Sequence, residues 1–325
     1  MKAKAVRIHS HGGTEVLGVE MIDVAEPGPN DVLIRQTAIG LNFQDTYHRS
    51  GFYPLPMPSG LGTEAAGVVE KVGVAVTRLK AGDRVCYAGG APGGCAAWRV
   101  YPADRLIRIP DGVSDEQAAA VLMKGMTIEY LLNRCYQVKA GDTVLFHAAA
   151  GGIGLLAGQW GRHLGARMIG IAGGPDKVRL ALENGYSVCI DRRTEDVVAR
   201  VKELTGGAGV PVVYDSVGKD TFEQSLNCLA PRGFFVSLGT TTGAPPPIDA
   251  ATLQKLGSLY FTRPTLVTYT AKNEELHASA QAVFALFAKG VLNVSINQRY
   301  PIDDIALAHR DLESGRTTGS TVIIP

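Results

Sequence analysis

The second half of the chain alternates between two hydrophobic patterns, and this alternation limits the possible folds more than any other feature. From Asp142, a buried-strand pattern, "DTVLFHA", is followed by a helical pattern, "GLLAGQWGRHL", and then by a second strand pattern, "RMIGIA". The strand patterns "SVCID", "PVVYDSV" and "GFFVSLG" follow, with a helical stretch before each. Alternation of this kind is typical of a parallel sheet with helices on both faces. We therefore predict a doubly wound α/β domain here.

The rest of the chain predicts a second domain. Up to about residue 110, short β-rich runs such as "DVLIRQTAIGL" alternate with Gly and Pro, which is typical of an antiparallel, partly barrel-like domain. A helix that begins near Ser114 leads into the α/β domain. After "GSLYFTRP" a long helical stretch and a final tail are expected to return to the first domain. Two domains also suit a chain of 325 residues.

The charge and composition argue against several classes of partner. Lys and Arg number 32 against 31 Asp and Glu, which gives a net charge of +1 and no electrostatic reason to bind nucleic acid or an anionic membrane. No apolar stretch approaches the roughly 20 residues that a membrane span needs, and the start lacks the apolar run of a signal peptide. The five widely spaced cysteines suggest no disulfide framework. We expect a cytoplasmic protein.

A glycine-rich segment, "LFHAAAGGIGLLAGQWGR", joins the first strand of the α/β domain to its first helix. Gly151 and Gly154 match the second and third glycines of a dinucleotide-binding turn, with Ala149 at the first position. N–H groups of such a turn and of the helix N-terminus bind a pyrophosphate. We predict phosphate contacts at Gly151, Gly152 and Ile153. The alternative is a tight turn that binds no ligand.

The second strand of this domain indicates which nucleotide is bound. NAD-binding domains place an acidic residue at this strand end, where it binds the ribose hydroxyls. Here the strand ends at Ala172, and Gly173 and Gly174 follow. Lys177 and Arg192 supply positive charge that suits a 2′-phosphate. The sequence therefore predicts NADPH, although a role as solvated surface charges stays open for both basic residues.

The whole chain resembles the medium-chain dehydrogenase/reductases, and within them the NADPH:quinone oxidoreductase (ζ-crystallin-like) subfamily. The most specific match is "GDTVLFHAAAGGIGLLAGQWGR", residues 141–162, with Gln159 and Arg162 in place. The resemblance implies a GroES-like, mostly-β catalytic domain at 1–125, completed by 268–325, and a Rossmann NADPH-binding domain at 126–267. It also implies a cleft for the nicotinamide and a homodimer. In similar proteins a sheet edge pairs across a two-fold axis, and we expect residues 233–239 to form that edge.

The resemblance also shows which positions of this sequence would have to carry the ligands of a catalytic zinc ion. Zinc-dependent members of the family carry a Cys in a Gly-x-Cys-x-x-Asp run and a His in a Gly-His-Glu run. The matching stretches here are "GLNFQD" and "GTEAAG", in which Asn42 and Thr63 stand at the ligand positions. Neither is a strong zinc ligand. We predict that no metal is bound and that Glu64, which remains, is a structural carboxylate bonded to neighbouring backbone.

Without zinc, a substrate oxygen must be polarised by hydrogen-bond donors. The segment "NFQDTYHRSGFYPLP" offers Asn42, Tyr47, Arg49 and Tyr53 as donors. The resemblance implies that Asn42 and Tyr53 flank the nicotinamide and the substrate, that Asp45 fixes the local turn, and that Tyr47 shapes the pocket. For each tyrosine, a packing role with a satisfied hydroxyl is the alternative.

Further coenzyme contacts are expected on a helix and at strand ends. Family members place "MKGMTIEY" on a helix that faces the nicotinamide carboxamide, with Thr127 and Tyr130 as candidates; for Lys124 a role as ion-pair partner stays open. His147 lies in an apolar strand and is expected to be a core residue. Arg263 has a domain-junction salt bridge as its alternative role. The candidates at strand ends are Ser216, Gly239, Thr240 and Arg263.

These observations predict a cytoplasmic NADPH-dependent quinone reductase, with a small-molecule quinone as its partner. Two alternatives remain. The first is an NADPH-dependent reductase of enone or alkenal double bonds, which needs the same hydride and the same polarisation. The second is a non-catalytic NADPH-binding structural or RNA-associated protein, which the near-neutral charge and the presence of Asn42 and Tyr53 argue against.

Overall fold

The computed structural model describes residues 1–325, and the chain divides into two compact units. The first unit comprises Met1–Met126, Thr270–Ala288 and Val294–Pro325, and the second comprises Thr127–Tyr269 and Lys289–Asn293. The boundaries expected from the sequence place all of 268–325 with the first domain. Residues Lys289–Asn293 group with the second unit, in which the Gln159 side-chain amide bonds the backbone N–H and carbonyl of Asn293.

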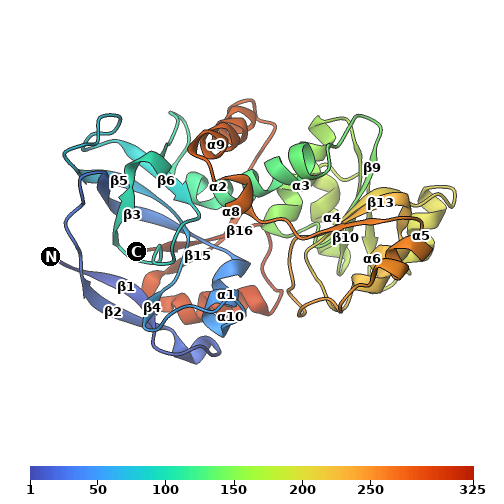
Figure 1. Ribbon diagram of the computed structural model, residues 1–325, viewed down its shortest axis with the longest axis horizontal. Helices are drawn as coiled ribbons and strands as arrows, with labels where there is room; N and C mark the ends of the chain where they lie inside the picture. The colour runs from blue at the N-terminus through green and yellow to red at the C-terminus, as the bar shows by residue number, and fades with distance from the viewer. The chain divides into compact units, whose positions relative to one another are not determined.

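The first unit is mostly β (Figure 1). One sheet has the order β15-β16-β3-β5-β6-β8, with β7 paired to β3, and a smaller sheet has the order β2-β1-β4. Only β15 and β16 pair in parallel; the other pairs are antiparallel, as predicted. The strands are β1 (Lys2–Ile8), β2 (Gly18–Asp23), β3 (Asp31–Leu41), β4 (Ser59–Gly60), β5 (Glu64–Val72), β6 (Arg84–Ala88), β7 (Trp98–Pro102), β8 (Ile107–Arg108), β15 (Ile296–Pro301) and β16 (Ser320–Ile324).

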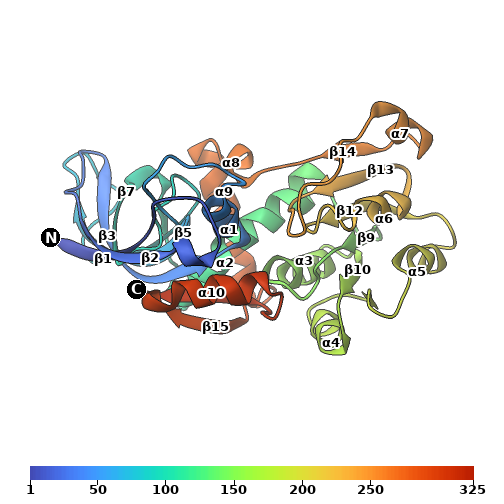
Figure 2. The same ribbon diagram turned by 90° about the horizontal axis from the view of Figure 1, so that it is seen from below.

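Apolar side chains on the inner faces of these strands form the core of the first unit, which includes Ile34, Ile39 and Val69. Helix α10 lies beside α1 in both ribbon views (Figures 1 and 2). Helix α2 begins in the first unit and ends in the second. The helices that begin in this unit are α1 (Phe43–Ser50), α2 (Asp115–Tyr130), α9 (Asn273–Ala288) and α10 (Ile305–Glu313).

The second unit contains one parallel sheet of six strands in the order β11-β10-β9-β12-β13-β14. The order reverses beside β9, which is the topology of a doubly wound nucleotide-binding fold, so the predicted fold class is confirmed. The strands are β9 (Thr143–Phe146), β10 (Arg167–Ala172), β11 (Val188–Asp191), β12 (Val210–Asp215), β13 (Leu229–Ser237) and β14 (Tyr260–Thr262). The helices are α3 (Gly152–His163), α4 (Pro175–Glu183), α5 (Val197–Leu204), α6 (Phe222–Asn227), α7 (Ala250–Lys255) and α8 (Leu266–Tyr269).

The expected sheet edge needs a correction. Strand β13 is interior, because β14 pairs with it in parallel, with Phe234 opposite Tyr260. Figure 2 shows β14 at the outer edge of this sheet. A strand of three residues, "YFT", is too short to show a hydrophobic period in the sequence. None of the helices is both long and apolar enough to span a bilayer.

Candidate active site

The start of helix α1 carries a buried polar group. Asn42 directly follows β3 and occupies the cap position of α1 in an extended conformation. Three residues on, the Asp45 side chain is fully buried, and its Oδ2 accepts a hydrogen bond of 2.9 Å from the backbone N–H of Asn42. A carboxylate at this position of a helix satisfies a backbone donor that the helix leaves unpaired. Asp45 therefore stabilises the turn between β3 and α1.

Glu64, the first residue of β5, is also fully buried and lies beside this turn. Its Oε1 accepts the backbone N–H of Met123 at 2.6 Å, and its Oε2 accepts the side-chain amide of Asn42 at 2.8 Å. The Nζ of Lys124 lies 3.8 Å from Oε2. Glu64 thus bonds backbone, as expected, and also the side chain of a candidate site residue, which the sequence did not indicate.

Both acids are perturbed by their surroundings. Burial raises the pKa of Asp45 from 3.8 to about 7; the hydrogen bond from Asn42 opposes the shift, and the negative charge of Glu64 adds to it. Burial also raises the pKa of Glu64, against the opposing effect of the Lys124 ammonium. Lys124 is therefore the ion-pair partner of Glu64 in the first unit.

Four aromatic rings form a cluster on and after α1. Ring centroids in this cluster, which consists of Phe43, Tyr47, Phe52 and Tyr53, lie 5.2 to 6.2 Å apart along its contacts. The backbone N–H of Tyr53 donates to the carbonyl of Tyr47 at 3.0 Å, which folds the segment back on the helix. Phe52 is 44% exposed. The cluster combines an apolar surface with two tyrosine hydroxyl groups.

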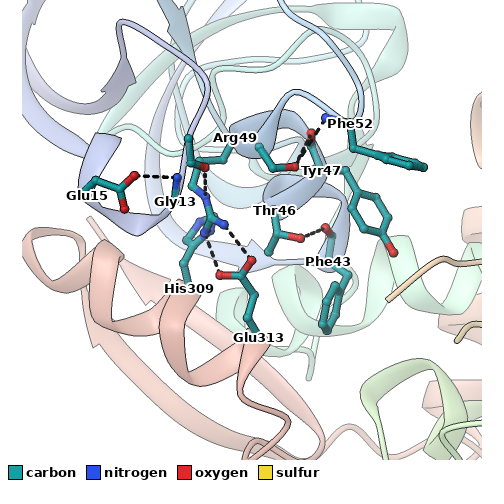
Figure 3. Close-up of polar contacts among 11 residues, drawn as sticks. Gly13, Glu15, Phe43, Thr46, Tyr47, Arg49, Phe52, His309 and Glu313 are labelled. Atoms are coloured by element: carbon teal, nitrogen blue, oxygen red, sulfur yellow. Dashed lines mark hydrogen bonds and ion pairs between the residues drawn. The ribbon is translucent and has the colours of Figure 1, made fainter. Parts of the chain in front are cut away.

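Arg49 faces the other way. Figure 3 shows the rings of Phe43, Tyr47 and Phe52 on the side of α1 opposite Arg49. The Arg49 guanidinium is 3% exposed and donates to the Gly12 carbonyl, to both carboxylate oxygens of Glu313 and to His309 Nδ1.

These bonds use four of the five N–H groups of the guanidinium. The sequence-based suggestion that Arg49 donates to a substrate is therefore wrong. Burial and the adjacent Arg49 lower the pKa of His309 to about 3, so this histidine is neutral and accepts the bond from the guanidinium. Arg49 fixes α1 to α10.

In the second unit, the glycine-rich turn after β9 leaves backbone N–H groups at the start of α3 uncovered by side chains. Gly151 is the cap residue of α3, and no side chain caps the helix there. The first N–H groups of α3, from Gly152 and Ile153, are those that a helix cannot satisfy internally. A Cβ on Gly154 would lie 2.3 Å from the carbonyl oxygen of Ala148, so only glycine fits. Such a turn can hold a phosphate on backbone donors and the helix dipole.

The strand after α3 ends beside a cluster of positive charges. A Cβ on Gly173 would lie 3.3 Å from Arg192 Nε and 3.4 Å from Arg193 Nε, so both guanidinium groups occupy the space that a side chain would fill. Burial, with the positive charges of Arg193 and Arg192, lowers the pKa of Lys177. Arg193 was missed by the sequence analysis, although "CIDRR" displays it. An anion would relieve the repulsion among these cations.

Strand ends bring further candidates together. Arg263 follows β14, and its Nη1 donates to Ser237 Oγ at 3.1 Å and to the Gly239 carbonyl at 3.3 Å. These contacts join the ends of β13 and β14 within the second unit. The backbone N–H of Thr241 donates to the carbonyl of Ser216, which brings the loops after β12 and β13 into contact. Thr240, between Gly239 and Thr241, is buried.

The remaining candidates are buried. Tyr130 stacks on Tyr269 with centroids 4.5 Å apart, and Thr127 lies one turn earlier on α2. His147 is a core residue, as predicted: it is 1% exposed and its Nε2 lies 2.8 Å from Ser225 Oγ.

The chain is similar to proteins of known name along its whole length. Residues 28–111 match the alcohol dehydrogenase GroES-like domain, and residues 152–287 match the zinc-binding dehydrogenase family. The quinone oxidoreductase of Pseudomonas aeruginosa is 50% identical over 324 residues, which cover 99% of this chain and all of that protein. A 2-haloacrylate reductase of Burkholderia is 42% identical, with 99% and 98% covered. The crystal structure of Escherichia coli quinone oxidoreductase complexed with NADPH superposes with a TM-score of 0.97 at 48% identity, covering 99% of this chain and all of that one.

Proposed function

Because the chain belongs to the quinone oxidoreductase family of medium-chain dehydrogenase/reductases, we propose that it is an NADPH-dependent quinone reductase. NADPH, when bound, supplies the hydride. The protein must hold the coenzyme, hold the quinone and stabilise the charge that develops on the quinone oxygen.

The observation that carries the coenzyme assignment is the cluster of Lys177, Arg192 and Arg193 beside Gly173. Mutual repulsion contributes to the lowered pKa of Lys177, and a 2′-phosphate, which NADH lacks, would relieve it. We propose that Gly173 and Gly174 give the phosphate room. Proposed pyrophosphate contacts are Gly151, Gly152 and Ile153, and proposed contacts nearer the nicotinamide are Asn42, Thr127, Tyr130, Ser216, Gly239, Thr240 and Arg263.

The aromatic cluster is the proposed quinone surface. A quinone is flat and apolar, with carbonyl oxygens at its rim, so it suits an apolar face that carries hydroxyl donors. Tyr53 and Tyr47 provide the hydroxyl groups, and Phe43 and Phe52 extend the apolar face. When hydride arrives, a tyrosine O–H bonded to the quinone oxygen stabilises the negative charge there.

The residues do not fit a catalytic zinc, despite the zinc-binding name of one matching family. The Asn42 amide nitrogen is bonded to Glu64, and the Thr63 hydroxyl is buried. No three His, Cys, Asp or Glu side chains converge as a metal site would require. We propose that the reaction needs no metal.

The 2-haloacrylate reductase relative favours a second candidate activity, reduction of a conjugated C=C bond. A panel of quinones, enones and 2-haloacrylates, each mixed with purified protein and NADPH, separates the two through the rate of NADPH oxidation. Faster turnover of quinones supports the proposal. Faster turnover of the conjugated acids or ketones assigns the second activity, and turnover of neither would refute a role in catalysis on these substrates.

We further propose a homodimer paired through β14. This strand is the sheet edge, and Tyr260 is 54% exposed on it, stacked on Phe234 with centroids 4.5 Å apart. Open edges of this kind are normally covered. The cytoplasm remains the proposed compartment, because all five cysteines are free thiols, which suits a reducing environment.

A further inference from the structure

The side chain of Asn42 has its donors directed into the protein. A primary amide has two N–H donors and one acceptor oxygen. The Nδ2 of Asn42 lies 2.8 Å from Glu64 Oε2 and 3.3 Å from the carbonyl oxygen of Gly40. A backbone carbonyl can only accept, so the amide nitrogen must point to this side. The amide oxygen of Asn42 faces the backbone N–H of Asp45 in the capping box of α1. The second lone pair of that oxygen is the hydrogen-bonding capacity that the side chain has left for a ligand.

Glu64 is itself held in one orientation. Its Oε1 accepts the backbone N–H of Met123 at 2.6 Å. Lys124 Nζ lies 3.8 Å from Oε2 and balances the charge of the carboxylate. The packing is tight, since a Cβ on Gly40 would lie 2.4 Å from Oε2. Both oxygens therefore accept N–H groups, and neither can turn to offer a donor to Asn42.

We propose that Glu64 is a positioning residue that makes Asn42 a hydrogen-bond acceptor, and that Asn42 binds an N–H or O–H group of the ligand rather than the quinone oxygen. The proposal rests on the proposed reductase function. A quinone oxygen can only accept, so it cannot bond the Asn42 oxygen. The available donors are the hydroxyl and carboxamide groups of the coenzyme and the hydroxyl groups of the hydroquinone product. Polarisation of the quinone is left to the tyrosines.

Mutation can exchange the hydrogen-bond donor and acceptor in the pair formed by Asn42 and Glu64. In Glu64→Gln, one side-chain oxygen is replaced by an NH2 group, so either Met123 N–H or the Asn42 amide meets a donor instead of an acceptor. In the double variant Asn42→Asp/Glu64→Gln, the glutamine oxygen accepts Met123 N–H and its NH2 donates to the new aspartate. The acceptor on the ligand side and the single negative charge near Lys124 are both restored.

The measurements are equilibrium dissociation constants, which need no turnover. NADPH is titrated into the free protein, and a hydroquinone is titrated into the protein with oxidised coenzyme. We expect Glu64→Gln to weaken one of these ligands about tenfold, the value of one hydrogen bond of about 1.4 kcal/mol, because a donor then faces the Asn42 amide. Asn42→Asp should weaken the same ligand, because its carboxylate repels that of Glu64 and turns away from the position of the amide. The double variant should return to within about threefold of wild type. A weaker NADPH complex assigns the donor to the coenzyme, and a weaker hydroquinone complex assigns it to the product.

Glu70→Gln, an exposed position on the same strand, is the matched control and should change neither constant. If Glu64→Gln does not fold, the comparison of the double variant with Asn42→Asp alone gives the same answer. If the double variant binds the ligand as weakly as the single variants do, the proposal is overturned. Aspartate has no N–H donor, so this result would mean that Asn42 donates a hydrogen bond to the ligand. Unchanged binding in Glu64→Gln would overturn it too. Failure of the reductase function appears separately, as a wild-type protein that binds NADPH and reduces no quinone.

Discussion

Asp45 should make the protein less stable as the pH rises, and Asp45→Asn should remove this effect. The carboxyl group is fully buried, and its Oδ2 accepts the Asn42 N–H. Burial, with the charge of Glu64, raises the pKa of Asp45 to about 7. The folded protein therefore favours the protonated acid at a pH where the unfolded chain ionises it.

The size of the effect follows from the difference between the two pKa values. A pKa raised in the folded state gives a stabilisation that is complete below the unfolded value, near 4, and is lost as the pH rises through about 7. A difference of about 3 units at about 1.4 kcal/mol each corresponds to a loss of at most about 4 kcal/mol. Of this, about 2 to 3 kcal/mol falls between about pH 5 and pH 8.

The assay is urea unfolding of wild type and Asp45→Asn at about pH 5 and pH 8, followed by circular dichroism. Asparagine keeps an oxygen that can accept the Asn42 N–H and does not ionise. The variant should therefore gain free energy of unfolding relative to wild type, and the gain should be about 2 to 3 kcal/mol larger at pH 8 than at pH 5. Asp111→Asn, at an exposed position of the first unit, is the matched control. The reasoning fails if the variant shows the same dependence on pH as wild type, or is less stable than wild type at pH 8.

Three further predictions concern coenzyme choice, catalysis and assembly. Arg193→Gln should weaken NADPH about tenfold and leave NADH unchanged, because one charge-assisted bond is lost; equal weakening of both coenzymes in titrations would contradict it. Tyr53→Phe should slow single-turnover hydride transfer, because the activation barrier rises by at most the roughly 2.7 to 4 kcal/mol that a lost oxyanion donor costs. The NADPH dissociation constant should not change, and an unaltered rate removes Tyr53 from the mechanism. Tyr260→Lys should convert a dimer into a monomer in light scattering, and a monomeric wild type argues against β14 as the interface.

The fold of the second unit could be predicted because its signals are local. Each of β9 to β13 is an apolar run bounded by glycine or a helix, and the alternation alone leads to the parallel sheet that the structure shows. Strand β14 carries no such signal. It forms only because Tyr260, Phe261 and Thr262 find partners on β13, so its existence depends on tertiary pairing.

The local contacts of the candidate site could also be predicted from the sequence, and its long-range contacts could not. Asn42 and Asp45 lie three residues apart, and their contact follows from the rules for a helix start. The partner of Arg49, by contrast, is 264 residues away on α10, and no local pattern announces it. The bond from Asn42 to Glu64 likewise depends on how β5 packs beside β3. These long-range contacts decide which polar side chains remain available to a ligand.

Helix α1 explains why such distant contacts matter for catalysis. With eight residues it is too short to be stable alone, so its position depends on what holds its ends. The N-terminal end is fixed through Asp45 and through the bond from Asn42 to Glu64, and the C-terminal end through Arg49 and Glu313 (Figure 3). The cation in the last turn, Arg49, also suits the helix dipole. The aromatic face lies between two anchored ends, so loosening either anchor should move the tyrosine donors and the Asn42 acceptor together.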